Sequence, residues 1–104
     1  MLNSKQRAYL KTLAQKQDVV LNIGKNGYSP EITEALEEVL EKRELVKVGV
    51  LQNCMEEPKD LAILLSERTH SEVVQIIGKK IIFYRESKDK PKIQLPKVKV
   101  KKEE

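Results

Sequence analysis

The sequence predicts a single α/β domain in which helices and strands follow the order α-β-α-β-α-β-β. Three patterns predict this class: apolar residues recur at helical spacing in three segments, short aliphatic runs separate those segments, and Gly78-Lys79 links the last two runs as a hairpin turn would. A chain of 104 residues has room for one modest core. We therefore expect a four-stranded mixed sheet packed with three helices in an α+β-like, two-layer arrangement.

The first helix is expected to begin after Asn3, whose side chain can cap it, and Gln6 three residues later completes a capping box. Its apolar stripe comprises Tyr9, Leu10, Leu13 and Ala14. The basic side chains beside this stripe are expected to stay in water: Lys5, Arg7, Lys11 and Lys16.

A short strand, Val19–Ile23, leads into a Gly-x-x-Gly loop formed by Gly24, Lys25, Asn26 and Gly27. Asn-Gly is also a common hairpin turn, so this loop alone is weak evidence. The next residues favour a helix, because Ser29 can cap it and Pro30 suits its first position. Apolar residues then repeat at helical spacing up to Arg43, so the glycines join a strand to a helix.

The second strand is predicted over residues 45–51, with Val46, Val48 and Val50 on one face. Pro58 opens the third helix, which ends near Arg68, and residues 72–77 and 80–84 form the final hairpin. Glycine at the first position of the link suits a type II′ turn. Two successive β-α-β units imply parallel pairings, followed by the antiparallel hairpin.

Charge is separated along the chain. Residues 85–104 carry eight basic and four acidic side chains, which accounts for the whole net charge of +4. Residues 1–28 carry five basic side chains and one acidic, whereas residues 31–44 carry six glutamates and two basic side chains. Such asymmetry favours a polyanionic partner on one face. We place the domain at residues 1–96, where Ile93 and Leu95 could dock, and expect residues 97–104 to be a disordered basic tail.

Several classes of function are excluded by composition. Cys54 and His70 are the only residues of their types, which rules out an internal disulfide and a metal site built from cysteines or histidines. No segment is apolar for long enough to span a bilayer, and no signal peptide is visible, so we expect a soluble cytoplasmic protein without membrane partners. Phosphate-binding and dinucleotide-binding fingerprints are absent, and the glutamates of the second helix resemble a solvated face. We therefore expect no catalysis and no cofactor.

Four segments together carry a resemblance to a known family: VLNIGKNG at residues 20–27, ELVKV at 44–48, VQIIGK at 74–79 with Tyr84-Arg85, and IQLP at 93–96. In these segments the chain resembles the stand-alone CRM-domain proteins, the YhbY family of bacterial RNA-binding proteins. The resemblance implies a fold similar to the C-terminal domain of bacterial translation initiation factor three. It also implies binding to ribosomal RNA in precursors of the large subunit during ribosome assembly, with the glycine loop as the RNA-binding element.

The glycine loop is therefore the expected site. Its glycines can adopt positive φ and admit an RNA backbone, Lys25 can contact a phosphate, and the following helix presents its N-terminus. Asn26 could donate to phosphate or hold a left-handed turn, and Tyr28 could stack on a base or cover the helix as a hydrophobic lid. The expected supporting contacts are Lys5, Arg7 and Lys11 in the first helix, Lys79 and Lys80 at the hairpin, and Arg85 after the last strand. With few aromatic residues, recognition should depend on the RNA backbone and shape.

A second hypothesis keeps the chain on the pre-ribosomal particle but changes its role. In this view the acidic second helix docks on another protein, so that the chain acts as an adaptor. A DNA-binding role is disfavoured, because the helix that would read a groove is acidic. In every case we expect a monomer that binds no small-molecule cofactor.

Overall fold

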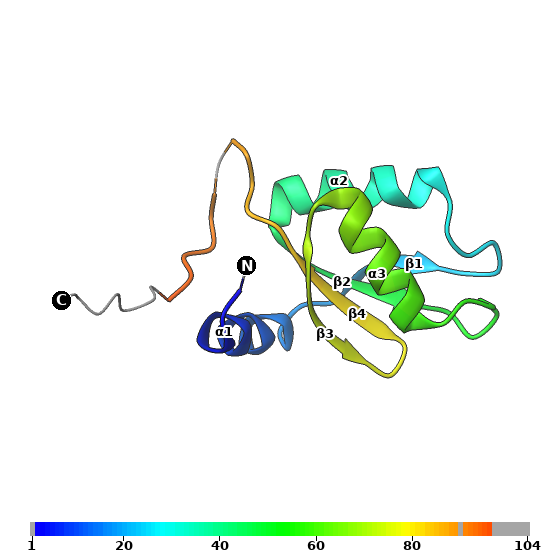
Figure 1. Ribbon diagram of the computed structural model, residues 1–104, viewed down its shortest axis with the longest axis horizontal. Coiled ribbons are helices and arrows are strands. Elements are labelled where there is room, and N and C mark those ends of the chain that lie inside the picture. The colour runs from blue at the N-terminus through cyan, green and yellow to red at the C-terminus, as the bar shows by residue number, and fades with distance from the viewer. Residues whose placement is uncertain (1, 90, 97–104) are drawn as a thin grey trace.

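The computed structural model describes residues 2–89 and 91–96, and contains the seven predicted elements in the predicted order (Figure 1). These elements are α1 (Ser4–Ala14), β1 (Val19–Ile23), α2 (Pro30–Arg43), β2 (Leu45–Val50), α3 (Pro58–Thr69), β3 (Glu72–Ile77) and β4 (Lys80–Tyr84). The predicted fold class is confirmed. The boundaries differ by a residue: β2 ends at Val50 and α3 extends to Thr69.

Helix and turn signals act where the sequence places them. The Asn3 side chain accepts a hydrogen bond from the Gln6 backbone at 2.7 Å, and the Gln6 side chain accepts one from Asn3 N–H at 3.1 Å, which completes the capping box of α1. Ser29 caps α2 in the same way by accepting from Ile32 N–H. At the β3–β4 hairpin only Gly78 of the two link residues has positive φ, as a type II′ turn requires.

The strands form one sheet in the order β1-β2-β4-β3. Strand β1 runs parallel to β2, whereas β4 runs antiparallel to both of its neighbours, β2 and β3. The expectation of two parallel pairings is therefore wrong, since β4 lies between β2 and β3. The physical reason is burial: residues 81–84 of β4 are buried on both faces, whereas Ile76 and Ile77 of β3 remain 39% and 50% exposed. The more apolar strand takes the central position.

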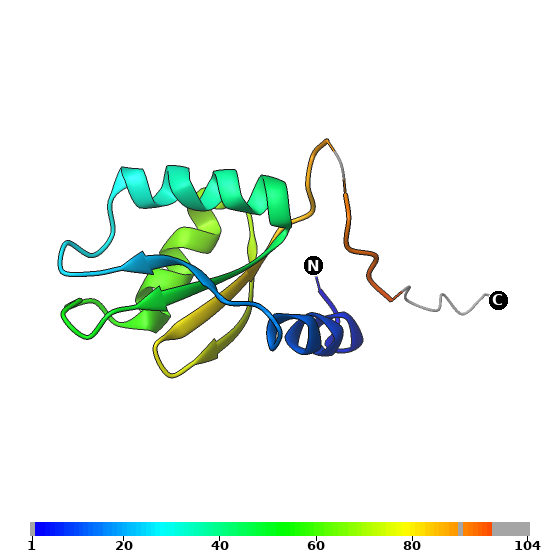
Figure 2. The same ribbon diagram turned by 180° about the vertical axis from the view of Figure 1, so that it is seen from behind.

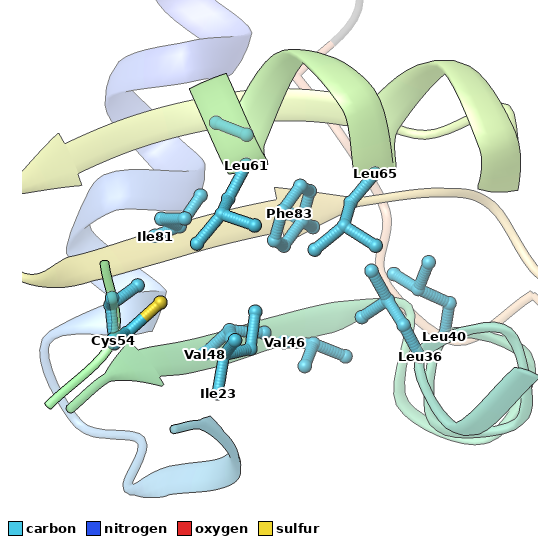
Figure 3. Packing of buried hydrophobic residues seen from close by; sticks show 12 residues of the cluster. Ile23, Leu36, Leu40, Val46, Val48, Cys54, Leu61, Leu65, Ile81 and Phe83 are labelled. Atoms are coloured by element: carbon cyan, nitrogen blue, oxygen red, sulfur yellow. The ribbon is translucent and has the colours of Figure 1, made fainter. Parts of the chain in front are cut away.

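Helices α2 and α3 cover one face of the sheet (Figures 1 and 2). Figure 3 shows side chains of this layer meeting those of the sheet, with Phe83 of β4 beside Leu61 and Leu65 of α3. The predicted inward face of β2 is confirmed, because Val46, Val48 and Val50 all belong to this core. Burial of such a continuous apolar layer is the main stabilising contribution to the fold.

Helix α1 packs on part of the opposite face. Leu10 and Ala14 of α1 contact a second buried cluster, formed by Leu45, Val74, Ile82 and Tyr84 of the sheet. Ile93 and Leu95 pack against this cluster, so the predicted docking of the C-terminal segment is confirmed. The predicted disordered tail, residues 97–104, lies outside the described residues.

Candidate nucleic-acid interface

The glycine loop is a closed turn at the end of β1. Gly27 N–H donates to Gly24 O at 2.9 Å, which places Lys25 and Asn26 at an exposed tip. The positive φ of the loop falls on Gly27, at +63°, and not on Asn26 or Gly24. Of the two roles considered for Asn26, the left-handed turn is therefore not formed, and Gly24 does not use its freedom to adopt positive φ, because the turn needs only one left-handed residue.

A side chain added at Gly24 or Gly27 would point towards the β2–α3 loop of the same chain, residues 51–57. A Cβ added to Gly24 would lie 3.4 Å from Leu51 Cδ1 and 3.6 Å from Asn53 Oδ1, which is ordinary van der Waals contact. A Cβ added to Gly27 would instead overlap the Glu56 carboxylate. Because that carboxylate is the end of a flexible side chain and can shift, it is the positive φ that makes glycine a stricter requirement at Gly27 than at Gly24.

Several backbone N–H groups at this corner already have partners. Tyr28 N–H donates to Glu56 Oε1 at 2.6 Å, Gly27 N–H to Gly24 O, and Ile32 N–H to the Ser29 cap. Pro30 has no N–H to offer. Most of the N–H groups expected to be free for a phosphate near the start of α2 are therefore already hydrogen-bonded. One of them, the Tyr28 N–H, already donates to an anion, the Glu56 carboxylate.

Tyr28 behaves as a lid. Its ring packs against the main core, its hydroxyl accepts a hydrogen bond from Thr33 Oγ1 at 3.1 Å, and the Arg68 guanidinium lies 6.0 Å from its ring centroid. The structure matches the lid interpretation, and a stacking role for Tyr28 remains a prediction.

The hairpin lysines lie at the same end of the sheet as the glycine loop. Lys80 pairs with Gly49 of β2, which in turn pairs with Asn22 of β1, so the three residues form one row across the sheet. Two strand spacings separate Lys80 from β1, roughly 10 Å. Lys79 is fixed there as well, because its carbonyl accepts from Val50 N–H. Lys25, Lys79 and Lys80 are all exposed, and they form what we call the loop-end lysines.

The basic residues of α1 are not brought to this end. Figures 1 and 2 place α1 and the β1–α2 loop at opposite ends of the molecule, because α1 leads into the start of β1 and the loop follows its end. The five-residue strand alone separates them by about 16 Å. Arg7 is also engaged structurally: its guanidinium donates to the carbonyls of Val73 and Val74 and pairs with Glu72 at 3.9 Å. Lys5 and Lys11 flank it at that distant end.

Arg85 is similarly used inside the fold. It pairs with Glu41 at 3.0 Å, donates to Thr69 O at 3.2 Å, and its side chain is only 13% exposed. Arg85 is therefore better explained as a structural residue that joins α2 to the end of α3.

Two glutamates, Glu41 of α2 and the C-cap residue Glu44 that follows it, hold the C-terminal segment, a role that sequence reasoning missed. Glu41 accepts from the Ser87 hydroxyl at 2.7 Å and from Lys88 and Asp89 N–H. These hydrogen bonds, that of Ser87 above all, lower the pKa of Glu41 to about 2. Glu41 is consequently not a free docking residue for an adaptor.

Glu44 performs the same task from a fully buried position. It accepts backbone hydrogen bonds from Ser87, Lys92 and Ile93 at 2.7–2.8 Å. Burial alone would raise the pKa of Glu44, but these donors together lower it. Burial and the nearby carboxylates of Glu44 and Glu86 raise the pKa of Tyr84 to about 12. The sequence does not reveal this role, because many helices end with a glutamate before a strand. The structure shows that Glu44 adopts a φ of +68°, which makes a tight turn and places its side chain inside the fold.

Residues 2–89 and 91–96 contain no group of three or more histidine, cysteine, aspartate or glutamate side chains arranged to hold a metal ion. Cys54 is a buried free thiol. None of the helices described is long and apolar enough to cross a membrane.

Comparison with known proteins gives a consistent result. The family model of the CRS1/YhbY (CRM) domain matches residues 2–85. The chain is 41% identical over 96 residues to the probable RNA-binding protein YqeI of Bacillus subtilis, covering 92% of this chain and all of YqeI. It is 33% identical over 96 residues to an RNA-binding protein of Haemophilus influenzae, covering 92% of this chain and 96% of that protein.

A solved structure is similar as well. The solution structure of the hypothetical protein SAV1595 from Staphylococcus aureus, which is proposed to bind RNA, superposes with a TM-score of 0.77 at 48% identity. The match covers 92% of this chain and all of that one.

Proposed function

Because the chain belongs to the CRS1/YhbY (CRM) domain family, we propose that it binds RNA through the glycine loop and the loop-end lysines. The target in this proposal is ribosomal RNA of large-subunit precursors, bound in the cytoplasm during ribosome assembly. The RNA-binding descriptions of YqeI, of the Haemophilus influenzae relative and of the Staphylococcus aureus structure support the first part. The choice of ribosomal RNA follows from the family resemblance of the sequence.

The observation that carries the site is the grouping of three exposed lysines at one end of the sheet. Lys25 projects from the tip of the glycine loop, and Lys79 and Lys80 lie at the hairpin two strands away. The backbones of β1 and β4 lie roughly 10 Å apart, and from there the flexible lysine side chains can reach separate phosphates of one RNA strand. Lysine supplies a mobile point charge, so this surface would recognise the sugar-phosphate chain and not base edges.

The proposal contains no catalytic step and no cofactor. Its chemistry is electrostatic: each lysine that contacts a phosphate releases a counterion, which supplies most of the affinity. The proposal also leaves Arg7 and Arg85 out of the RNA contacts, because their guanidinium groups are already bound to backbone carbonyls and glutamates.

Crosslinking in cells tests the target and the site together. We would compare the wild-type protein with Lys25→Glu, and use Lys42→Glu as the matched control, because Lys42 is an exposed lysine at the opposite end of α2. UV crosslinking followed by RNA sequencing should give reads concentrated on large-subunit ribosomal RNA for the wild type and for Lys42→Glu. Those reads should fall at least about fivefold for Lys25→Glu, since one phosphate contact becomes a repulsion.

Three results would contradict the proposal in different ways. Equal crosslinking of both variants would move the RNA contact away from the glycine loop. Crosslinks that avoid ribosomal RNA would remove the proposed target, and a complete absence of RNA crosslinks would favour the adaptor hypothesis. In that case the docking face would have to be the outer side of α2 around Glu34 and Glu38, since Glu41 and Glu44 are engaged.

A further inference from the structure

The Glu56 carboxylate lies on the glycine loop as an internal anion. It accepts the Tyr28 N–H at 2.6 Å, and it fills the space that a side chain at Gly27 would need. Glu56 comes from the exposed β2–α3 loop, which is held to the end of β1 by the hydrogen bond from Leu51 N–H to Ile23 O at 2.8 Å. The hydrogen bond to Tyr28 and the contact with Gly27 both place the Glu56 side chain over these two residues, where the RNA backbone would approach in the proposed complex.

A carboxylate and a phosphate compete for the same kind of donor. Both are anions that accept hydrogen bonds from backbone N–H groups, and both are favoured near the N-terminus of a helix such as α2. While Glu56 remains on Tyr28, a phosphate there would lack the donor and would also meet a like charge. The closed loop and the RNA-bound loop are consequently alternative states.

We propose that Glu56 is a gate for the glycine loop, an autoinhibitory contact that an RNA phosphate must displace before the loop can bind it. The inference rests on the proposed function and specifies how the same site is regulated. The gate weakens the binding of any phosphate at Tyr28, and an RNA that also engages Lys25, Lys79 and Lys80 has additional contacts that offset this cost.

Displacing the Glu56 carboxylate from the Tyr28 N–H costs little free energy. The Tyr28 N–H is the hydrogen-bond partner that residues 2–89 and 91–96 provide for this carboxylate, and the contact is exposed to solvent. A single exposed hydrogen bond contributes little net stability, because water replaces it when it breaks. Glu56 can therefore leave without unfolding the loop, but while it stays it lowers the apparent RNA affinity in proportion to the closed fraction.

Alanine substitution of adjacent glutamates provides a matched test. Glu56→Ala removes the gate, whereas Glu57→Ala removes the same charge from the next residue, whose side chain makes no capping hydrogen bond to α3. Binding of fluorescently labelled fragments of large-subunit ribosomal RNA should tighten about three- to tenfold for Glu56→Ala. For Glu57→Ala, which changes only the general charge, the gain should be less than about twofold.

A second readout does not depend on RNA. Inorganic phosphate titrated into the ¹⁵N-labelled protein should shift the Tyr28 and Gly27 amide signals at a several-fold lower concentration in Glu56→Ala than in the wild type or in Glu57→Ala. Glu56→Gln, which keeps the side-chain shape and removes the charge, should behave between wild type and Glu56→Ala. Its well-dispersed spectrum would also establish that the loop remains folded.

The outcomes separate the gate from the proposed function. Equal RNA affinity and equal phosphate response in Glu56→Ala and Glu57→Ala would overturn the gate, even if all variants bind RNA. Weaker RNA binding in Glu56→Ala would also overturn it, since Glu56 would then support the bound loop. Enhanced phosphate response with no RNA binding by any variant would show that Glu56 competes with phosphate at Tyr28, but it would reject the proposed RNA function and with it the gate for RNA.

Discussion

At the scale of single residues, the two loop glycines have different physical roles. Gly27 adopts a φ of +63°, which L side chains rarely adopt, and a Cβ there would also require the flexible end of Glu56 to shift. Gly24 has neither constraint, because its nearest neighbours would meet a Cβ at ordinary contact distance. A Gly-x-x-Gly pattern therefore does not by itself reveal which glycine the fold requires.

This difference predicts unequal effects of alanine. Gly27→Ala should lower the free energy of unfolding by about 1–2 kcal/mol, since alanine is strained in the left-handed region. Gly24→Ala should leave it unchanged or raise it by up to about 1 kcal/mol, because it restricts the unfolded chain. Urea denaturation followed by circular dichroism measures both, and equal effects of the two substitutions would contradict this assignment.

At the scale of elements, the C-terminal segment is held to α2 by two carboxylates. Glu41 and Glu44 accept backbone N–H groups from residues 87–93, and Ile93 and Leu95 then pack beside α1. The Gln6 side chain adds a hydrogen bond to Pro96 O at 3.2 Å. Glu41 near the end of α2 and Glu44, the residue that follows this helix, thus hold the C-terminal segment by hydrogen bonds, besides contributing negative charge.

The segment should therefore detach in acid. The pKa of Glu41 falls from about 4.5 to about 2 in the fold, so its stabilising contribution is complete above about pH 4.5 and is lost as the pH falls towards 2. The pKa of Glu44 is lowered too, which reinforces the same direction. Amide signals of Lys88, Asp89 and Ile93 should move to random-coil positions over this range, before that of Val48 in the core.

Glu41→Gln provides the control for this acid transition. Glutamine keeps an acceptor oxygen but cannot titrate, so the remaining transition should be smaller and should report Glu44. Simultaneous loss of the segment signals and the Val48 signal would mean that the segment does not detach as a separate unit.

At the scale of the whole molecule, strand order determines which charges meet. The arrangement β1-β2-β4-β3 brings the hairpin lysines of β4 near the end of β1, and the direction of β1 places α1 at the other end. The basic residues are therefore divided into separate groups. Within residues 2–89 and 91–96, the loop-end lysines lie at the same end of the sheet as the glycine loop, where Lys59 at the start of α3 is also exposed.

This division predicts a modest salt dependence for RNA binding. If the three loop-end lysines each contact one phosphate of a single strand, the logarithm of the affinity should fall with the logarithm of salt concentration at a slope of roughly −2. Lys25→Gln should reduce the magnitude of that slope by roughly 0.7. Fluorescence anisotropy over a salt series measures both quantities, and a slope near zero would exclude phosphate contacts as the source of affinity.

Local signals in the sequence were sufficient to predict every element. The Asn3–Gln6 capping box, Ser29 and Pro30, and the Gly78 turn all depend on contacts within a few residues, which a sequence displays directly. The same reasoning predicted the inner face of β2 and the docking of Ile93 and Leu95. In the apolar stripe of α1 it was right for Leu10, Leu13 and Ala14 but wrong for Tyr9, which is 38% exposed. It failed for the pairing of β3, because two strands of similar pattern compete for the centre of a sheet and their relative burial decides.

For the candidate site, too, some features follow from the sequence and others only from the tertiary structure. The sequence by itself determined the order of elements, the fold class, and the exposed tip formed by Lys25 and Asn26. Tertiary structure alone decided that Arg7, Arg85 and Glu41 are engaged within the fold, and that Glu56 lies on Tyr28. The physical reason is distance along the chain. Helix caps and turns are made by near neighbours in the sequence, whereas the partners of Arg7, Arg85 and Glu56 lie 16 to 67 positions away.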